Sequence, residues 1–280
     1  MTEKQRNMDV IITHNDLNKI SFPNFTKKEL DFLYGTIISL YNKNGRSVRV
    51  SFSEIMKAVE LEFINKTEAD FAPWLNSFTT KAAQVICPMY MIDKNNGELF
   101  ARVPFFGSIA FSFDYKYIEF KINPDFKYIL EKQKSEYTAF SFGLFKSFKK
   151  KYDKLLFRLI SQWKTVGKVY FEISEFKRLM DVPNSYGPSK IRQSIIDPTV
   201  KSLIEVCPGL SAETVREDNR AIGYKFTWDA SHFKKLKKDE IAAKNAKKLN
   251  KMSKSVRKPK VSEFKVVEDN EYDEMLEHLI

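Results

Sequence analysis

The chain has few of the residues from which metal, disulfide and nucleotide sites are built. Its two cysteines, Cys87 and Cys207, are far apart, and its three histidines neighbour neither a cysteine nor one another. The sequence therefore shows no pattern for a zinc site, a disulfide framework or a histidine-based strand-nicking site. The phosphate-binding pattern GxxxxGK followed by Ser or Thr also fails, because Val169 follows Gly167-Lys168. We expect no metal, no cofactor and no enzymatic activity.

Long apolar runs are absent as well. No segment approaches the roughly 18 apolar residues that a membrane-spanning helix requires. The start, MTEKQRNMDV, lacks the apolar stretch of a secretory signal. With 43% hydrophobic and 30% charged residues, the composition is that of a globular chain, and 280 residues are enough for two domains. We expect a soluble, cytoplasmic protein without a membrane partner.

Positive charge is concentrated in the second half of the chain. The formal net charge of +11 divides into +1 over 1–139, +6 over 140–232, +10 over 233–260 and −6 over 261–280. A basic excess of this kind indicates a polyanionic partner. An anionic membrane is the weaker candidate, because no basic segment carries the apolar face of an interfacial helix. Nucleic acid is the stronger candidate.

Hydrophobic spacing predicts a helix, a short strand, two helices and a ribbon of strands in the first half of the chain. This is the order of a winged helix, a helix-turn-helix core with a β-ribbon appended. Thr26 is expected to open the first helix, Ser53 to cap the second, and Cys87-Pro88 to stop the third. The expected elements fall at 26–42, 47–52, 54–60, 71–86 and 89–122.

The same order returns in the second half, after a connecting helix expected near 124–134. Gly167 should close the first helix there, and Ser174 should cap the second. The turn Asp218-Asn219-Arg220 separates the last two strands. The expected elements fall at 149–164, 168–172, 174–180, 188–206, 214–217 and 222–228.

Matching dipeptides support an internal repeat. Ser53-Glu54 matches Ser174-Glu175 at an offset of 121, and Cys87-Pro88 matches Cys207-Pro208 at an offset of 120. Chance similarity between two α+β domains is the alternative. We predict an α+β fold of two tandem winged-helix domains with a basic then acidic tail, at 1–136, 137–232 and 233–280.

The segment from Pro188 to Val206 is the strongest candidate for DNA contact. Its apolar residues are spaced to form a buried side, which we expect to hold Ile191, Ile195, Ile196, Val200, Leu203 and Ile204. In the helix after the turn of such a domain, Arg or Lys suits guanine and Gln suits adenine in the major groove. An ordinary solvated helix face is the alternative. The candidate DNA-binding residues are Ser189, Lys190, Arg192, Gln193, Ser194 and Lys201.

Other features extend this candidate interface. Asp197-Pro198 should kink the long helix or restart it with Asp197 as cap. A phosphate partner would offset the unfavourable charge of three lysines at a helix start. The first domain offers a weaker set of candidate DNA-binding residues, which suits phosphate positioning or dimer contact. Its Phe-rich ribbon is expected to be core, with a subunit interface as the alternative. The further candidates are Lys149, Lys150, Lys151, Arg220 at the ribbon tip, Lys66, Thr79, Thr80 and Lys81.

Four stretches carry a resemblance to a known family, of which HNDLNKISFPNFTKKELDFL near the start and IEFKINPDFKYIL from Ile118 to Leu130 are the weaker two. KKYDKLLFRLISQWK, from Lys150 to Lys164, is similar to the first helix of the family's second domain. LMDVPNSYGPSKIRQSIIDPTVK, from Leu179 to Lys201, is similar to its turn, tyrosine and recognition helix. Over about residues 10–232 the chain resembles plasmid replication initiators of the iteron-binding class, which carry two tandem winged-helix domains. It departs from the family where Ser202-Leu203-Ile204 stands in place of a frequent Glu-Ile-Asn.

The resemblance implies a non-enzymatic initiator that binds direct repeats in the double-stranded DNA of an origin. Such proteins help to open adjacent AT-rich DNA and recruit host replication initiator and helicase proteins. Dimers, in equilibrium with monomers, commonly repress their own gene, and monomers initiate. A transcriptional repressor or partition protein built from the same modules is the alternative, and a metal-dependent nuclease is a third class.

The charged tail completes the sequence-based prediction. Its basic arm, 233–260, is expected to add nonspecific phosphate contacts, and its acidic end, 261–280, to compete with DNA for that arm. A tail without fixed structure is the alternative.

Overall fold

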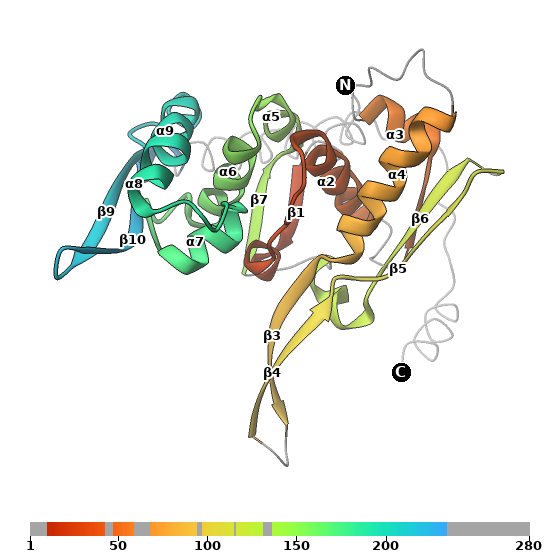
Figure 1. Ribbon diagram of the computed structural model, residues 1–280, viewed down its shortest axis with the longest axis horizontal. Coiled ribbons are helices and arrows are strands. Elements are labelled where there is room, and N and C mark those ends of the chain that lie inside the picture. The colour runs from red at the N-terminus through yellow and green to blue at the C-terminus, as the bar shows by residue number, and fades with distance from the viewer. Residues whose placement is uncertain are drawn as a thin grey trace, which may run out of the picture. The chain divides into compact units, whose positions relative to one another are not determined.

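The computed structural model describes residues 10–42, 47–58, 68–93, 97–114, 116–130 and 136–233 (Figure 1). All of them belong to one structural unit, Met1–Phe233. The predictions made for Lys66 and for the charged tail from Lys234 onward fall outside the described residues.

The first half begins its winged helix with α2 (Lys27–Asn42). Thr26 opens it through a capping box, as predicted: Glu29 N–H donates to Thr26 Oγ1 at 3.3 Å, and Thr26 N–H donates to Glu29 Oε2 at 2.7 Å. Strand β2 (Ser47–Ser51), helix α3 (Phe52–Ala58) and helix α4 (Glu68–Ala83) follow in the predicted order.

The start of α3 corrects the prediction that Ser53 caps it. Ser51 Oγ accepts from Glu54 N–H at 3.2 Å, and Glu54 Oε2 accepts from Ser51 N–H at 2.8 Å. Ser53 therefore lies inside the first turn. The physical reason is that Glu54 stands three residues after Ser51, which is the spacing that a capping box requires.

Strands of the first half form a sheet and a separate hairpin. The sheet has the order β2-β6-β5, with β5 (Phe106–Ser112) and β6 (Tyr117–Ile122) antiparallel. The hairpin pairs β3 (Ile86–Asp93) with β4 (Gly97–Pro104). Phe105, Phe106 and Phe120 are buried, as expected of core residues, whereas Phe111 is exposed.

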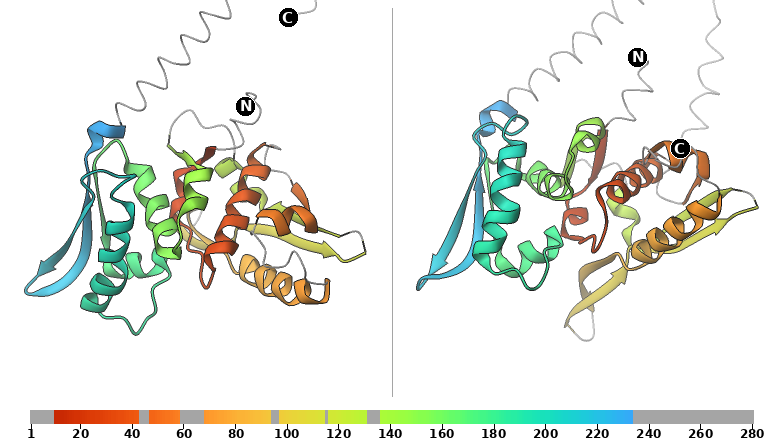
Figure 2. Two further views of the ribbon diagram at one scale, coloured as in Figure 1. Left: turned by 90° about the horizontal axis from the view of Figure 1, so that it is seen from above. Right: turned by 45° about the horizontal axis from the view of Figure 1, so that its top comes forward.

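The second half repeats the sheet without the extra hairpin. It contains α6 (Lys151–Trp163), β8 (Lys168–Glu172) and α7 (Ile173–Met180). A long helical segment follows in three parts, α8 (Pro188–Ile191), the π-helical η3 (Arg192–Ile196) and α9 (Asp197–Leu203). Strands β9 (Ser211–Glu217) and β10 (Arg220–Thr227) complete the sheet order β8-β10-β9, and they contact α7 and α9 (Figure 2).

The offset of the internal repeat holds up to the third helix and then fails. Ser47 and Lys168 begin equivalent strands, and Phe52 and Ile173 begin equivalent helices, both 121 positions apart. The β3–β4 hairpin is inserted after α4, so the strands that follow it no longer lie about 121 positions before their counterparts in the second half. We therefore correct the prediction that Cys87-Pro88 stops α4. The helix ends at Ala83 and the dipeptide lies in β3, whereas Cys207-Pro208 lies in the turn after α9.

Further corrections concern the second half. Helix α7 begins at Ile173 and its N-cap is Glu172, so Ser174 is not the cap. Ile204, which was expected on the buried side, is 47% exposed at the C-cap of α9. The connecting element is the short 3-10 helix η2 (Pro124–Leu130), and β9 begins three residues earlier than predicted.

Two strands join the beginning of the described chain to the middle. Strand β1 (Val10–His14) is followed by the 3-10 helix η1 (Asn15–Lys19) and pairs antiparallel with β7 (Tyr137–Ser141). Helix α5 (Phe142–Ser147) follows β7. These strands bring together residues on both sides of the predicted boundary at 136, and that boundary stays a prediction.

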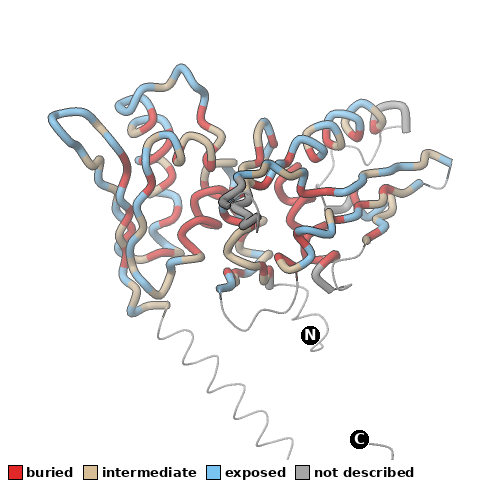
Figure 3. The backbone as a smooth tube through the Cα atoms, turned by 90° about the horizontal axis from the view of Figure 1, so that it is seen from below, coloured by how far each residue is buried: buried red, intermediate tan, exposed pale blue. Residues whose placement is uncertain are grey.

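Helix α6 is the centre of the structural unit. Its residues from Asp153 to Ser161 are all buried, and three of them carry charged side chains. Figure 3 shows buried segments of the chain gathered in the middle of the unit. Lys154 Nζ donates to Asp31 Oδ1 of α2 at 2.7 Å. On another face, Asp153 Oδ2 accepts from Ser202 Oγ of α9 at 2.7 Å. A helix that is buried all round packs against elements on several sides, so α6 connects the first winged helix to the candidate recognition segment.

Candidate nucleic-acid interface

The candidate recognition segment α8–η3–α9 is anchored by its apolar side. Ile191, Ile195, Ile196 and Leu203 are buried, as predicted, and Val200 is partly buried. Pro188 stands in the first turn of α8, where its missing N–H costs no helical hydrogen bond. Tyr224 Oη of the wing strand β10 donates to the Pro188 carbonyl at 3.2 Å. The beginning of the recognition segment is thus fixed to the wing, the β9–β10 hairpin.

Most of the predicted DNA-binding residues on this segment are exposed. Lys190 Nζ lies 5.6 Å from the centre of the Tyr186 ring, in cation–π range. The amide of Gln193 and the hydroxyl of Ser194 are on the next turn, and each is a donor and acceptor for base edges. The exposed set consists of Ser189, Lys190, Gln193, Ser194 and Lys201. Their contact with DNA stays a prediction.

Arg192 differs from these residues, because its guanidinium contacts the protein itself. Nε lies 2.6 Å from Asp197 Oδ1, and Nη1 donates to the Ala212 carbonyl of β9 at 2.6 Å. The side chain is about a third exposed. The sequence placed Arg192 among base-reading candidates because local spacing does not show which partner an arginine finds across the fold.

The interruption at Asp197-Pro198 follows the predicted restart, with one correction. Helix α9 begins at Asp197, but its N-cap is Ile196 and no side chain caps it. The backbone N–H of Asp197 instead donates to the Arg192 carbonyl, which closes the π turn. Asp197 is therefore the first residue of α9 and not its cap.

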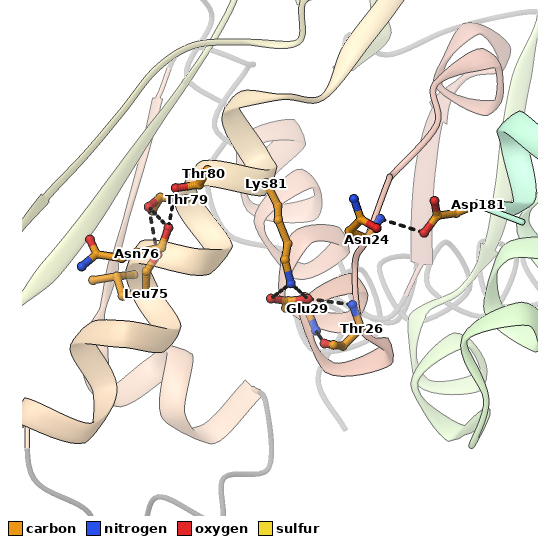
Figure 4. Close-up of polar contacts among 9 residues, drawn as sticks. All are labelled: Asn24, Thr26, Glu29, Leu75, Asn76, Thr79, Thr80, Lys81 and Asp181. Atoms are coloured by element: carbon orange, nitrogen blue, oxygen red, sulfur yellow. Dashed lines mark hydrogen bonds and ion pairs between the residues drawn. The ribbon is translucent and has the colours of Figure 1, made fainter. Parts of the chain in front are cut away.

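Two of the three lysines at the start of α6 are exposed. Lys149 and Lys150 stand at the N-terminus of the helix, and Lys150 is its N-cap without a side-chain hydrogen bond. Lys151 forms an ion pair with Asp181, at the C-cap of α7. Asp181 also accepts from the backbone N–H of Asn24 at 2.7 Å (Figure 4). Lys151 thus contributes to the junction between the two halves of the unit, and its DNA contact stays a prediction.

The tip of the wing presents two exposed arginines next to two exposed acidic residues, Glu217 and Asp218. Asp218 and Asn219 both adopt positive φ, which closes the two-residue turn of the hairpin. Arg220 is exposed directly after the turn and pairs across the hairpin with Glu217. Arg216, which the sequence interpretation missed, is also exposed, and its Nη1 donates to the Asn219 carbonyl at 3.2 Å. Its position two residues before the predicted turn Asp218-Asn219-Arg220 could have identified Arg216 as a residue of the wing tip.

The corresponding helix of the first half uses its candidate groups internally. Thr79 Oγ1 donates to the Leu75 carbonyl at 2.9 Å, and Thr80 Oγ1 donates to the Asn76 carbonyl at 2.8 Å (Figure 4). Lys81 Nζ contacts both carboxylate oxygens of Glu29, at 2.9 and 3.1 Å. The threonine bonds lie within α4, and only the Lys81–Glu29 pair joins α4 to α2. DNA contact by the three residues stays a prediction.

A buried carboxyl group lies beneath α9. Asp153 is 1% exposed, and of its two oxygens Oδ2 accepts from Ser202 while Oδ1 has no hydrogen-bond partner. Burial raises the pKa of Asp153 above its ordinary value, although the Ser202 hydroxyl and the charge of Lys150 oppose the rise. Among the described residues, no group of three His, Cys, Asp or Glu side chains is arranged to hold a metal ion. No helix of the described ranges is long and apolar enough to cross a membrane.

Comparisons with known proteins agree with the two-part architecture. The WH1 part of the Initiator Replication protein family matches residues 10–161, and the Initiator Rep protein WH2 part matches residues 172–228. The probable replication protein rep of Bifidobacterium longum (strain NCC 2705) is 24% identical over 227 residues, which cover 79% of this chain and 72% of that protein.

A solved structure shares the fold. The crystal structure of Pi initiator protein in complex with iteron DNA has a TM-score of 0.53 at 13% identity, and the match covers 79% of this chain and 97% of that chain. The predicted pair of winged-helix domains is confirmed by both family parts and by this likeness. The chain belongs to the Initiator Replication protein family and carries its WH1 and WH2 parts in order.

Proposed function

We propose that this replication initiator binds direct repeats at a plasmid origin through its second winged helix. The observation that carries the proposal is the exposed set of donors at the start of the recognition segment, above all Lys190, Gln193 and Ser194. The tip of the wing adds two exposed arginines, Arg216 and Arg220. A recognition helix with such a face reads base edges in the major groove, and phosphate contacts fix its register. Family membership and the likeness to a protein bound to iteron DNA support it.

The first winged helix adds a second attachment point on the same DNA. Two such domains in one chain fit successive major grooves, a footprint of about 20 base pairs. One monomer per repeat follows from this spacing. The first domain positions phosphates or contacts a second copy, because its α4 threonines and Lys81 are bonded within the fold. We further propose that dimers repress the gene while monomers initiate, and that host initiator and helicase proteins are recruited to the opened origin.

Binding and initiation are tested separately. Purified protein is titrated with its own upstream DNA and with a scrambled duplex of equal length across a salt series. We expect the upstream DNA to be preferred at physiological salt, with a protected region of about 20 base pairs. Equal affinity for both duplexes, falling steeply with salt, would leave only a nonspecific basic binder.

Variants connect that binding to named side chains. The double variant Lys190→Ala, Gln193→Ala should lose preference for the repeat, whereas Lys168→Ala should keep it. Lys168 is a matched control, because it is an exposed lysine of the same sheet that pairs with Thr227, at the opposite end of the wing from Arg220. Both variants should unfold at the wild-type temperature.

The alternative function is a transcriptional repressor or partition protein without initiator activity. It predicts the same specific binding, so binding cannot distinguish the two. A plasmid carrying the origin and lacking this gene should replicate when the gene is supplied in trans. Absence of replication despite specific binding would favour the repressor. Incubation of origin DNA with the protein and Mg²⁺ should leave the DNA uncut, since we propose a non-enzymatic initiator acting in the cytoplasm.

A further inference from the structure

The π turn in the middle of the recognition segment has a definite cause. Pro198 has no backbone N–H, so it cannot donate to the carbonyl four residues earlier, and its ring crowds that carbonyl. The backbone opens by one residue there, and Asp197 N–H donates to the Arg192 carbonyl, five residues back. Arg192 and Asp197 therefore stand at the two ends of one widened turn.

The side chains of the same two residues are also joined. Arg192 Nε lies 2.6 Å from Asp197 Oδ1, so this pair is connected through both backbone and side chain. Asp197 belongs to the exposed face of the segment, and its carboxylate draws the guanidinium along the helix surface. The π turn thus brings the acceptor into the reach of Arg192.

A third contact connects this turn to the wing. Arg192 Nη1 donates to the Ala212 carbonyl at 2.6 Å. Ala212 lies in β9 and pairs with Phe226, a buried residue of β10, so its backbone is fixed in the sheet. One planar guanidinium thereby bridges the middle of the recognition segment and the first strand of the wing. Arginine suits this role better than lysine, because its donors are arranged in a rigid fork.

We propose that Arg192 is a positioning residue, which holds the recognition segment at a fixed distance and angle from the wing through Asp197 and Ala212. It does not read a base. Gln193 and Ser194 are carried on the turn that Arg192 holds, and Lys190 lies on the turn directly before it, so the loss of Arg192 misplaces all three together. The proposal rests on the proposed function, in which the segment and the wing contact one DNA duplex.

The direction in which one substitution changes DNA affinity distinguishes a positioning role from a simple charge effect. Asp197→Ala removes a negative charge from the exposed face of the segment. If charge alone mattered, this change would strengthen attraction to phosphates. If Asp197 holds Arg192 in place, the same change weakens binding to the repeat and leaves nonspecific binding equal or stronger.

The experiment uses the full chain with Arg192→Ala, Arg192→Lys, Asp197→Ala and the double variant Arg192→Ala, Asp197→Ala. Gln193→Ala serves as the base-reading control. Affinity is measured for the repeat, for a scrambled duplex and for repeats changed at each base pair in turn. Amide hydrogen exchange of residues 211–217 is measured without DNA, with exchange of residues 151–163 as the reference for global stability.

We expect each single alanine variant to lose about tenfold in affinity for the repeat, and the loss should be the same for the repeats changed at each base pair. The double variant should bind the repeat no more weakly than the single variant with the lower affinity. Arg192→Lys should recover only part of the loss. Gln193→Ala should relax discrimination at one base pair. Exchange in 211–217 should rise in Arg192→Ala by at least about threefold, while 151–163 is unchanged.

Two results would overturn the proposal. One is a relaxation at a single base pair in Arg192→Ala together with unchanged or tighter binding in Asp197→Ala, which would make Arg192 a base contact. The other is unchanged exchange in 211–217. If the wild-type protein binds repeat and scrambled DNA alike, the proposed function fails, and the exchange measurement still decides whether Arg192 holds the wing strand.

Discussion

Lys154 of α6 and Asp31 of α2 form an ion pair at 2.7 Å that connects the two winged helices in the interior of the unit. Lys154 is fully buried, and its Nζ also donates to the carbonyls of Phe145 and Lys146. Burial lowers the pKa of Lys154 and raises the pKa of Asp31, each opposed by the attraction of the partner. Desolvation is the largest cause of both shifts, as expected for two charged groups removed from water.

Breaking this pair should destabilise the unit strongly. Lys154→Met and Asp31→Leu each leave a buried charge without its partner, which costs about 3 kcal/mol of unfolding free energy. The double variant leaves no unpaired charge and should lose clearly less than the sum of the two single variants. Urea unfolding of all four proteins gives the coupling. Strict additivity would show that the two groups do not interact.

Asp153 should make stability depend on pH in a definite direction. Burial raises its pKa, so ionisation is less favourable in the folded chain than in the unfolded one. That cost is present above the raised pKa and disappears as pH falls below the ordinary value of about 3.9. Asp153→Asn should therefore unfold at a higher temperature than the wild type at pH 7, with the difference closing towards pH 4. Ser202→Ala, which removes the donor to Asp153 Oδ2, should lower the unfolding temperature at pH 7. A difference that stays constant with pH would contradict the assignment.

The exposed lysines before α6 should act through phosphate contacts. Replacing Lys149 and Lys150 by alanine should weaken binding to repeat and scrambled duplexes alike. The slope of log K against log salt should become shallower by about 2, because each contact contributes about 0.9. Lys168→Ala, which removes one exposed positive charge elsewhere on the surface, is the control and should change the slope less. A loss confined to the repeat would instead indicate base reading by one of the two lysines.

Gly223 should be required for the shape of the wing. It lies at the register shift of the β9–β10 pair, and a Cβ there would stand 2.5 Å from the Phe171 carbonyl oxygen. Gly223→Ala should therefore cost about 2 kcal/mol of unfolding free energy through overpacking. Gly187→Ala is the control, because nothing lies within 4 Å of an added Cβ at that position. Equal stability of the two variants would show that the sheet adjusts.

The acidic end of the chain should weaken nonspecific DNA binding. Residues 261–280 carry a net charge of −6 next to an arm of +10. Deleting 261–280 should tighten binding to a scrambled duplex at low salt, and the difference should shrink as salt rises. Unchanged affinity at low salt would show that the acidic segment does not compete with DNA.

Local patterns in the sequence were enough to predict the order of elements within each winged helix, but not β1, β7 and α5. Apolar residues at helical spacing identified α2, α6 and the recognition segment, and Gly167 and Asp218-Asn219 marked turns. The buried side of the recognition segment followed from the same spacing, except at Ile204. These features depend on residues within a few positions of one another, which is why one sequence was sufficient. The repeat also predicted that the same order of elements along the chain would occur in both halves.

The tertiary structure decided the properties that depend on distant partners. No spacing shows that Arg192 meets Ala212, that Lys81 meets Glu29, or that Lys154 is buried, since each partner comes from another element. The identical dipeptides Cys87-Pro88 and Cys207-Pro208 make the same point, because one lies in a strand and the other in a turn. The sequence by itself determined a repeated, basic winged-helix architecture through local hydrophobic period and charge. Which cations remain exposed for DNA was decided only by the packing of elements that are far apart in the chain.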